Sequence, residues 1–399
     1  MLRYLTAGES HGQALVVVVE GLPAGLAFSK EEVQAELARR RLGYGRGPRM
    51  RFEKDEVTLL AGVRHGRTLG SPLAIEIANT EWPKWVEEMS PAPGATAKPL
   101  TKPRPGHADL AGMQKYGLKD ARDVLERASA RETAARVAAG CAAKALLAHL
   151  GVSVVSHVVA LGGVHVGRPG CGSGHGGDGA GGSYPRPRPE DLDAVDRSEV
   201  RCFDPSAEPA MVAAIKQAAK DGDSLGGTAE VLAYGVPVGL GSYAHWDRRL
   251  DGLLAQALMS IQAIKAVEIG DGMEISDRRG SVSHDAIVWE PGIGAYRRET
   301  SRAGGIEGGI STGEMIVARV FMKPLATLNR PVLKTVDTAT KEETVSFKER
   351  TDVTAVPAMG VVAETMVALV LAQEAIRKFG GDSLEEMLYN FHGFVESLR

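Results

Sequence analysis

The sequence Glu20-Gly21-Leu22-Pro23-Ala24-Gly25-Leu26 has a counterpart in the second half of the chain, Tyr234-Gly235-Val236-Pro237-Val238-Gly239-Leu240. Each copy follows an apolar run typical of a strand and precedes an amphipathic helix pattern. A second pair, Ala130-Arg131-Glu132-Thr133 and Val362-Ala363-Glu364-Thr365, lies on two long stretches rich in Ala and Val that are typical of helices. These two pairs predict an internal duplication, with chance similarity of short apolar segments as the alternative.

The duplication is predicted to lie within a single domain, residues 1–399, with halves at about 13–150 and 227–380. Apolar periodicity and two capping boxes, which begin at Ser29 and Ser129, predict the elements. The expected strands are 14–19, 57–63, 72–77, 152–159, 230–238, 266–269, 286–289 and 315–322, and the expected helices are 29–41, 129–149, 207–220, 247–264, 359–378 and a short one from 383.

The grouping of these elements favours the α+β class. Strands come with hairpin-like spacing, and helices do not strictly alternate with them, which argues against a doubly wound parallel sheet. A duplicated α+β unit would place a helical layer between two antiparallel sheets, an internally duplicated sandwich.

Composition is that of an ordinary globular chain, with 44% hydrophobic and 24% charged residues. A net charge of −3 gives no reason to expect nucleic acid or membrane binding, so any anion site must come from local clustering. Three widely spaced cysteines argue against a disulfide framework and for a reducing cytoplasm. No signal-peptide pattern is seen, and the longest apolar run, 361–371, is too short to span a bilayer. The Gly-rich stretch 167–182 is interpreted as a flexible excursion with no assigned function.

The stretch Gly8-Glu9-Ser10-His11-Gly12 joins two glycines to a carboxylate, a hydroxyl and an imidazole. His11 is of the residue type that gains and loses a proton near neutral pH. The stretch matches the nucleophile elbow of hydrolases by letter, but that elbow needs a following helix and a strand is expected here. Three interpretations stay open: a hydrolase nucleophile at Ser10, a plain turn between strands, and a turn that brings His11 to a ligand.

Arginines cluster between residues 39 and 51 and are interleaved with three glycines. Flexible backbone with fork-shaped donors suits a phosphate or carboxylate ligand. A solvated helix end is the second interpretation, and nucleic acid binding is the third, although no aromatic residues are interleaved for base stacking. The arginines are Arg39, Arg40, Arg41, Arg46, Arg49 and Arg51.

Two further segments place charges beside unusual backbone. In Arg104-Pro105-Gly106-His107-Ala108-Asp109, the imidazole has a cation and a carboxylate close in sequence, which indicates a second acid or base. In Arg127-Ala128-Ser129-Ala130-Arg131-Glu132, two arginines flank an expected helix N-terminus, where free N–H groups favour an anion. An ordinary capping box explains Ser129 and Glu132, but it does not explain two cations at the positive end of a helix.

Three segments are weak on their own: Arg302-Ala303-Gly304-Gly305-Ile306-Glu307-Gly308-Gly309, Lys323-Pro324-Leu325-Ala326-Thr327 and Arg350-Thr351-Asp352. The Gly-x-Gly-x-x-Gly match at 174–179 follows no strand, so a dinucleotide site is rejected. No Walker A or His-Glu-x-x-His motif occurs, and no metal site is predicted. If the arginines converge, they suit a small ligand with several negative charges and a phosphorylated cofactor.

The motifs at 8–12, 104–109, 127–133 and 302–309 together closely resemble the chorismate synthase family, in the family's order and over nearly the whole chain. The resemblance implies a carbon–oxygen lyase that performs anti-1,4-elimination of phosphate from 5-enolpyruvylshikimate 3-phosphate to give chorismate, the last common step of the shikimate pathway. It also implies reduced FMN (FMNH2) as cofactor, no net redox change, and a cytoplasmic homotetramer of β-α-β sandwich subunits. Nothing resembles an added reductase domain, so an external flavin reductase or another source of reduced flavin is expected.

The resemblance also implies residue roles. His11 resembles the acid that protonates the departing phosphate, and an adjacent phosphate dianion favours its protonated form. His107 resembles the residue that stabilises anionic charge at the flavin N1 and O2 edge, and Asp352 resembles the carboxylate that assists flavin N5 as it takes the C6 hydrogen. The matching substrate-binding positions are Arg40, Arg46, Arg49, Arg104, Ser129, Ala130, Arg131 and Arg350. The matching cofactor-binding positions are Arg127, Ala128, Ser129, Gln262, Ala263, Gly308, Lys323, Pro324, Leu325, Ala326, Thr327 and Arg350. Residue 301 is Ser where the family pattern has Asn.

Overall fold

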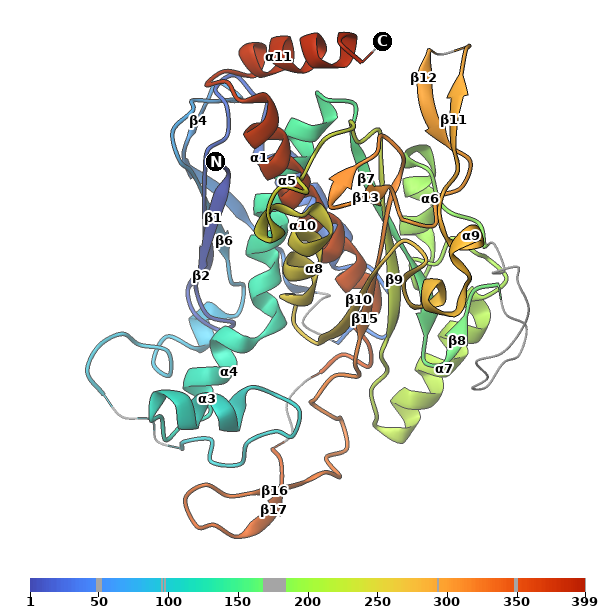
Figure 1. Ribbon diagram of the computed structural model, residues 1–399. Helices are drawn as coiled ribbons and strands as arrows, with labels where there is room; N and C mark the ends of the chain where they lie inside the picture. Colours follow the sequence, from blue (N-terminus) through green and yellow to red (C-terminus); the bar gives the residue numbers. More distant parts are fainter. Residues whose placement is uncertain are drawn as a thin grey trace.

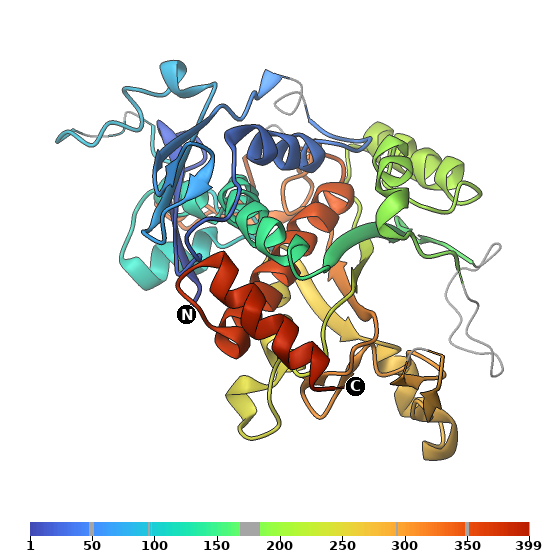
Figure 2. The same cartoon turned by 90° about the horizontal axis from the view of Figure 1, so that it is seen from above.

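The structure is a computed structural model, and it describes residues 1–47, 52–94, 96, 98–167, 184–292, 294–347 and 351–398. Two antiparallel sheets lie on either side of a layer of helices (Figures 1 and 2). The Gly-rich stretch 167–182, apart from Gly167, lies outside the described residues, as do Arg49, Arg51 and Arg350.

The first sheet has the strand order β1-β2-β6-β3 and comes from the N-terminal part of the chain. Its strands are β1 (Arg3–Ala7), β2 (Ala14–Glu20), β6 (Leu73–Ala78) and β3 (Val57–Ala61), and neighbours pair antiparallel. Alternate residues of β2 and β6, such as Val17 and Ile75, are fully buried, whereas Leu5 and Val18 are exposed on the other face. Because side chains alternate along a strand, only one face of this sheet packs on the helices.

The second sheet has the strand order β10-β15-β9-β7-β8. Its strands are β10 (Ile264–Ile269), β15 (Ile316–Met322), β9 (Gly227–Tyr234), β7 (Ser153–Leu161) and β8 (Val164–His165). Strands β7 and β9 are buried on both faces. A small second cluster explains the outer burial, because Val155, Leu232 and Val317 pack under Leu192 and Tyr234 there.

The helical layer contains α5 (Thr133–Ala148), α10 (Val356–Phe379), α1 (Lys30–Arg40) and α8 (Leu250–Met259). Helices α5 and α10 approach closely at Gly140, where an added Cβ would lie only 2.2 Å from Thr365 Cβ. Among the described residues, α10 is the one helix long and apolar enough to cross a membrane, but 94% of that apolar window is buried inside the fold. Its hydropathy is therefore that of a core helix.

The two sheets share a connection pattern. The chain order β2-α1-β3-β6-α5 in the first half corresponds to β9-α8-β10-β15-α10 in the second. In the sheets, β2-β6-β3 corresponds to β9-β15-β10. This correspondence supports the predicted pseudo-repeat, which stays a prediction as a division of the chain.

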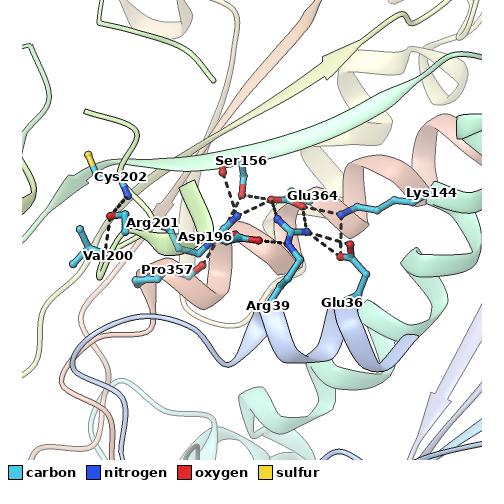
Figure 3. A network of polar contacts seen from close by, with 11 residues as sticks. Glu36, Arg39, Lys144, Ser156, Asp196, Val200, Arg201, Cys202, Pro357 and Glu364 are labelled. Carbon is cyan, nitrogen blue, oxygen red and sulfur yellow. Dashed lines mark hydrogen bonds and ion pairs between the residues drawn. The ribbon is translucent and has the colours of Figure 1, made fainter. Parts of the chain in front are cut away.

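A buried network of charges ties the helical layer to the second sheet (Figure 3). Its centre is the fully buried carboxylate of Glu364 on α10, which accepts hydrogen bonds from Arg39 (2.8 Å), Lys144 (2.7 Å) and Ser156 (2.7 Å). The other charged members are Glu36, Asp196 and Arg201. We call this set the Glu364 network.

Most expected elements are confirmed within a few residues, including the capping box at Ser29 and the buried face of α1 formed by Val33 and Leu37. The capping box at Ser129 is wrong. Ser129 Oγ accepts from Arg131 N, and a turn of 3-10 helix, η2 (Ala130–Glu132), precedes α5. The helix expected over 247–264 is shorter, since it divides into η4 (Trp246–Arg248), α8 and a loop.

The other elements of the described chain are β4 (Val63–Arg64), β5 (Arg67–Thr68), η1 (Trp82–Lys84), α3 (Asp109–Tyr116), α4 (Arg122–Ala128), η3 (Pro189–Asp191), α6 (Leu192–Arg197), α7 (Glu208–Asp221), η5 (Gly272–Asp277), α9 (Gly280–Ser283), β11 (Ile287–Glu290), β12 (Ala295–Arg298), β13 (Ile306–Glu307), β14 (Ile310–Ser311), β16 (Lys334–Val336), β17 (Glu343–Val345) and α11 (Leu384–Glu396).

Candidate active site

A cavity of about 640 Å³ lies where the two halves of the chain meet. That volume is in the range of small-molecule and cofactor sites. The β1–β2 turn, the end of α1, the loop before α3, the α4–α5 junction, the segment after α8, the segment after β15 and the first turns of α10 all contribute residues to its wall. The three residues predicted to be catalytic, His11, His107 and Asp352, all line this cavity.

His11 lies in the turn of the β1–β2 hairpin and is 9% exposed. Its Nδ1 lies 2.9 Å from Glu126 Oε1, and its backbone N–H donates to Glu126 Oε2 at 2.8 Å. The imidazole stacks on Trp85, with ring centroids 4.1 Å apart and planes inclined by 26°. These contacts hold the ring in one place at the cavity wall.

Glu126 is a buried carboxylate on α4, with 2% exposure. Burial alone would raise the pKa of Glu126, but the hydrogen bonds and charge of His11, with the charge of Arg122, hold that pKa below its ordinary value. Glu126 is therefore ionised at neutral pH and favours a positive charge on its neighbours.

His107 belongs to a cluster with Arg104 and Asp109. Its Nδ1 lies 2.5 Å from Asp109 Oδ1, while Arg104 Nε donates to Asp109 Oδ2 at 2.8 Å. Arg104 Nη1 also donates to Thr327 Oγ1 at 3.0 Å, which connects the loop before α3 to the segment after β15. Burial would raise the pKa of Asp109, but these two partners hold it well below its usual range. The charged pair fixes the His107 ring at the cavity.

Arg40 carries the most unusual charge of the cavity. It is 4% exposed, Nε donates to Thr133 Oγ1, and Nη2 donates to the carbonyl of Ala130. Within the described ranges, its buried Nη1 has no hydrogen-bond partner. Burial, with the charges of Arg131 and Arg46, lowers the pKa of Arg40 to about 9. At neutral pH the group is still a cation, and it lacks a counter-charge in contact.

Arg46 and Asp352 form an ion pair at the wall of the same cavity, with Arg46 Nη1 3.2 Å from Asp352 Oδ2. Asp352 Oδ1 accepts from the backbone N–H of Gly47 at 2.5 Å. Arg46 Nε is buried and has no partner in the part of the chain that the structure describes. Arg46 thus has one donor, Nε, that is not used by the described residues, and it lies next to the oriented carboxylate of Asp352.

Arg131 also lines the cavity, but acidic residues already meet its charge. Its Nη1 contacts Asp55 Oδ1, Nε donates to Asn79 Oδ1 at 2.9 Å, and Nη2 lies 3.6 Å from Glu53 Oε1. The carboxylates come from the segment before β3. Arg131 is therefore held more rigidly than Arg40, with less unmatched charge to offer a ligand.

The cavity also brings together most of the residues predicted to bind the cofactor. Gln262 Oε1 is buried without a partner among the described residues, although Gln262 Nε2 donates to Glu132 Oε2 at 3.1 Å. Ala263 has a left-handed backbone, with φ of 68°, which is uncommon for a residue with a Cβ. The residues of this set that line the cavity are Ala128, Ser129, Gln262, Ala263, Lys323, Leu325, Ala326 and Thr327.

An unpaired amide oxygen, a lysine, hydroxyls and apolar side chains together fit a flat heteroaromatic ring that carries a phosphate. The residues present are therefore compatible with FMN.

Of the residues predicted to bind substrate, Arg40, Arg46, Arg104, Ser129, Ala130 and Arg131 all line the cavity. Arg49 and Arg350 lie outside the described residues.

Three residues predicted to bind the cofactor do not line this cavity. Arg127 donates to the carbonyls of Thr6 and Gly8, and Pro324 lies between two cavity residues. Gly308 is in the β13–β14 turn, next to Gly309, whose carbonyl accepts from Leu250 at the start of α8. Since the cavity lies at the other end of α8, Gly308 is about 15 Å away along that helix.

Sequence reasoning missed several residues of the site. Trp85 and Glu126 support His11, while Thr133, Met359 and Val362 line the cavity. The apolar pattern of α10 indicated burial but could not distinguish residues facing a core from residues facing a cavity. No local signal in the sequence connects Glu126 with His11.

The hydrolase interpretation of Ser10 has no support. The 8–12 stretch joins β1 to β2, so a strand follows where the nucleophile elbow requires a helix. The His11 nitrogen nearest the turn, Nδ1, is engaged by Glu126. The stretch is both a turn between strands and one wall of the cavity.

The fold and the cavity define a class of protein in which arginines and histidines line one space of ligand size, as in enzymes that act on small anions. A family model described as chorismate synthase matches residues 2–376. Curated proteins named chorismate synthase are similar over the full chain: that of Thermobifida fusca is 56% identical, with 100% of this chain and 99% of the relative covered, and that of Salinispora tropica is 57% identical with the same coverage. A solved structure titled "Crystal Structure of Chorismate Synthase" superposes with a TM-score of 0.76 at 39% identity, covering 100% of this chain and 98% of that chain.

The chain belongs to the chorismate synthase family. It is accordingly a lyase, and the predicted family, activity and α+β fold class are confirmed.

Proposed function

We propose that the chain performs the anti-1,4-elimination of phosphate from 5-enolpyruvylshikimate 3-phosphate in the cavity described above, with reduced FMN as its cofactor. One observation carries the proposal: His11, His107 and Asp352 line one cavity together with Arg40, Arg46 and Arg104. These residues come from segments spread over most of the chain, yet they meet around a space of ligand size.

The arginines would bind the substrate. The substrate carries a phosphate and two carboxylates, and the cavity holds two buried guanidinium nitrogens, Arg40 Nη1 and Arg46 Nε, that lack partners within the described ranges. A buried donor without an acceptor is costly, so an anion that accepts from these two donors gains charge-assisted hydrogen bonds.

His11 would act as the acid. Its Nδ1 is turned to Glu126, so its Nε2 is the nitrogen left to donate a proton to the phosphate oxygen as the C–O bond breaks. The carboxylate of Glu126, 2.9 Å from Nδ1, would hold the ring in the orientation that this step needs. Asp352, oriented by Arg46 and Gly47, would assist removal of the C6 hydrogen.

Residues near the segment after β15 would hold the flavin. Lys323 and Thr327 supply a cation and a hydroxyl, Gln262 supplies its unpaired Oε1, and His107 would face anionic charge on the ring. Reduced FMN, when bound, supplies the electron-rich ring needed for an elimination without net redox change. The protein's part is to orient both molecules and exclude water.

The assembly and the cellular partners are part of the same proposal. A homotetramer is supported by the exposed apolar residues Leu5, Val18 and Leu60 on the outer face of the first sheet. We also propose a cytoplasmic location and an external flavin reductase or other source of reduced flavin. No nucleic acid or membrane partner is proposed.

The test is an anaerobic assay with 5-enolpyruvylshikimate 3-phosphate and chemically reduced FMN. Phosphate and chorismate should appear together, and oxidised FMN in air should give neither. Release of no phosphate under reducing conditions would contradict the proposed function. A change in the oxidised FMN spectrum when substrate is added would report binding of both molecules in one cavity.

A further inference from the structure

We propose that Glu126 is a positioning residue that selects the tautomer of His11 and keeps His11 Nε2 directed at the cavity. The proposal rests on the proposed role of His11 as the acid. Glu126 directly precedes the predicted motif 127–133 and is not part of any predicted motif. Its carboxylate is 2% exposed and does not line the cavity, so its effect on the reaction is placed in its contacts with His11.

Glu126 binds the His11 segment at three points. The carbonyl of Glu126 accepts from Ser10 N at 2.9 Å, Oε2 accepts from His11 N at 2.8 Å, and Oε1 lies 2.9 Å from His11 Nδ1. A single residue of α4 thus fixes both the backbone and the ring of the β1–β2 turn. A purely structural contact would need only the two backbone bonds.

The third contact determines which nitrogen carries the proton. The pKa of Glu126 is held below its ordinary value, so the carboxylate is ionised and can only accept hydrogen bonds. His11 Nδ1 must therefore carry a hydrogen in both the neutral and the cationic ring. Nε2 is then the nitrogen that gains and loses the proton, and Nε2 is the one left for the cavity.

Two further residues restrain the pair. Arg122 Nη1 donates to Glu126 Oε1 at 3.1 Å, and the Arg122 guanidinium lies 4.9 Å from the centre of the Trp85 ring that stacks on His11. Glu88 balances Arg122, 3.3 Å from its Nε. The other charged groups around the imidazole line the same cavity, namely Arg40, Arg46, Arg104, Arg131, His107, Lys323 and Asp352.

The test compares wild-type chain with Glu126→Gln, which keeps the size of the side chain and removes its charge. Glu126 Oε2 lies within hydrogen-bond distance of both His11 N and His11 Nδ1, so a glutamine oxygen at that position still accepts from both, but a neutral amide is a weaker acceptor than the carboxylate and competes less well for the Nδ1 hydrogen. Nitrogen NMR of ¹⁵N-histidine-labelled protein, with His11 assigned by its loss in His11→Asn, reads the tautomer without any ligand. We expect Nδ1–H in the neutral wild-type ring and a smaller Nδ1–H population in Glu126→Gln.

The kinetic readout uses the same variant. We expect kcat to fall by about 10²-fold with little change in KM, because His11 loses orientation and charge support rather than substrate contact. Glu87→Gln, an exposed carboxylate of the same region, is the matched control and should leave both readouts unchanged.

Two results would overturn the proposal: a neutral wild-type His11 with its hydrogen on Nε2, or a Glu126→Gln ring with an unchanged tautomer. Failure of the proposed function gives a different pattern, because wild-type protein would then make no chorismate whatever the NMR spectra show. Thermal unfolding shows whether Glu126→Gln is folded at the temperature of the NMR measurement. A changed tautomer in folded protein is then not a result of misfolding.

Discussion

Arg39 and Arg40 are neighbours on α1, yet their guanidinium groups lie in opposite electrostatic environments. Arg39 enters the Glu364 network, where three cations meet three carboxylates and every charge has a partner (Figure 3). Arg40 enters the cavity, where its Nη1 has no partner and, among the described residues, no carboxylate lies within ion-pair distance. One helix end therefore supplies one cation to structure and one to the site.

The pKa values of the two arginines follow this difference. Burial lowers the pKa of both groups, but Glu364, Glu36 and Asp196 more than reverse that effect at Arg39, whose pKa is raised. For Arg40, burial and the neighbouring cations prevail, and its pKa is lowered to about 9. We expect the Glu364 network, in which every charge has a partner, to stabilise the fold. We expect the buried cation of Arg40, which has no counter-charge in contact among the described residues, to bind an anion. The predictions below test that distinction.

The largest effects on turnover are expected at the two histidines that line the cavity. His11→Ala and His107→Ala should each reduce kcat by about 10²–10⁴-fold, the range for acid–base residues, without a comparable change in thermal stability. Steady-state phosphate release measures the effect. His149→Ala, an exposed histidine after α5, is the control. Near wild-type turnover of either cavity variant would show that its assigned role is wrong.

Substitutions in the Glu364 network should instead change the stability of the fold. Glu364→Gln leaves Arg39, Lys144 and Arg201 around a neutral amide, and removing one partner from a buried charge network costs about 3–5 kcal/mol. Urea unfolding measures the change, with exposed Glu56→Gln as control. A loss below about 1 kcal/mol would mean that the network does not stabilise the fold.

The same network predicts a dependence on pH. Burial would raise the pKa of Glu364, but the charges of Arg39, Lys144 and Arg201 hold it well below the ordinary value of 4.5. The stabilisation is therefore complete above pH 4.5 and is lost as the pH falls from that value toward the lower pKa of the folded state. Wild-type protein should lose free energy of unfolding below pH 4.5 more steeply than Glu364→Gln. Parallel acid profiles would contradict the assignment.

At Arg40 we expect a smaller loss of stability than at Glu364, together with a loss of substrate affinity. Arg40→Ala removes two hydrogen bonds but also a costly buried charge, so the free energy of unfolding should fall by less than about 2 kcal/mol. Substrate affinity should fall by about 10- to 10²-fold, since bonds to a charged ligand contribute about 1.5–3 kcal/mol. Calorimetry with the substrate gives the affinity. If Arg40→Ala destabilised the protein as much as Glu364→Gln, the contrast between the two environments would fail.

The sequence predicted the residues of the cavity better than those of the Glu364 network. His11, His107, Arg40 and Arg104 stand in short motifs whose residue types already signal chemistry, and all four line the cavity. Glu364 stood only in the segment 362–365 that resembles 130–133, and nothing there indicated a charge network. Its partners come from α1, α5, β7 and the segment near Arg201, and no local pattern connects such distant segments.

The same limit explains the error at Ser129. The pattern Ser-x-x-Glu predicts a capping box, because a free Glu side chain would return to the cap. Here the Glu132 carboxylate accepts from Thr6 at 2.8 Å, Arg136 at 2.9 Å and Gln262 at 3.1 Å. The Glu132 carboxylate is therefore bound by residues from other segments and by Arg136, and it does not return to the backbone N–H of Ser129. The positions of most strands and helices were predictable, since they depend on periodicity within each segment.

The smallest effect is expected where charges are paired but exposed. Lys334 and Glu343 pair at 3.4 Å across the β16–β17 hairpin, which projects from the body of the fold, and their side chains are 84% and 77% exposed (Figure 1). Because water and salt screen such a pair, Lys334→Ala should change the free energy of unfolding by less than about 0.5 kcal/mol in urea. A loss above about 1 kcal/mol would mean that the hairpin is covered in the assembled protein, so that burial, rather than pairing alone, again sets the strength of the interaction.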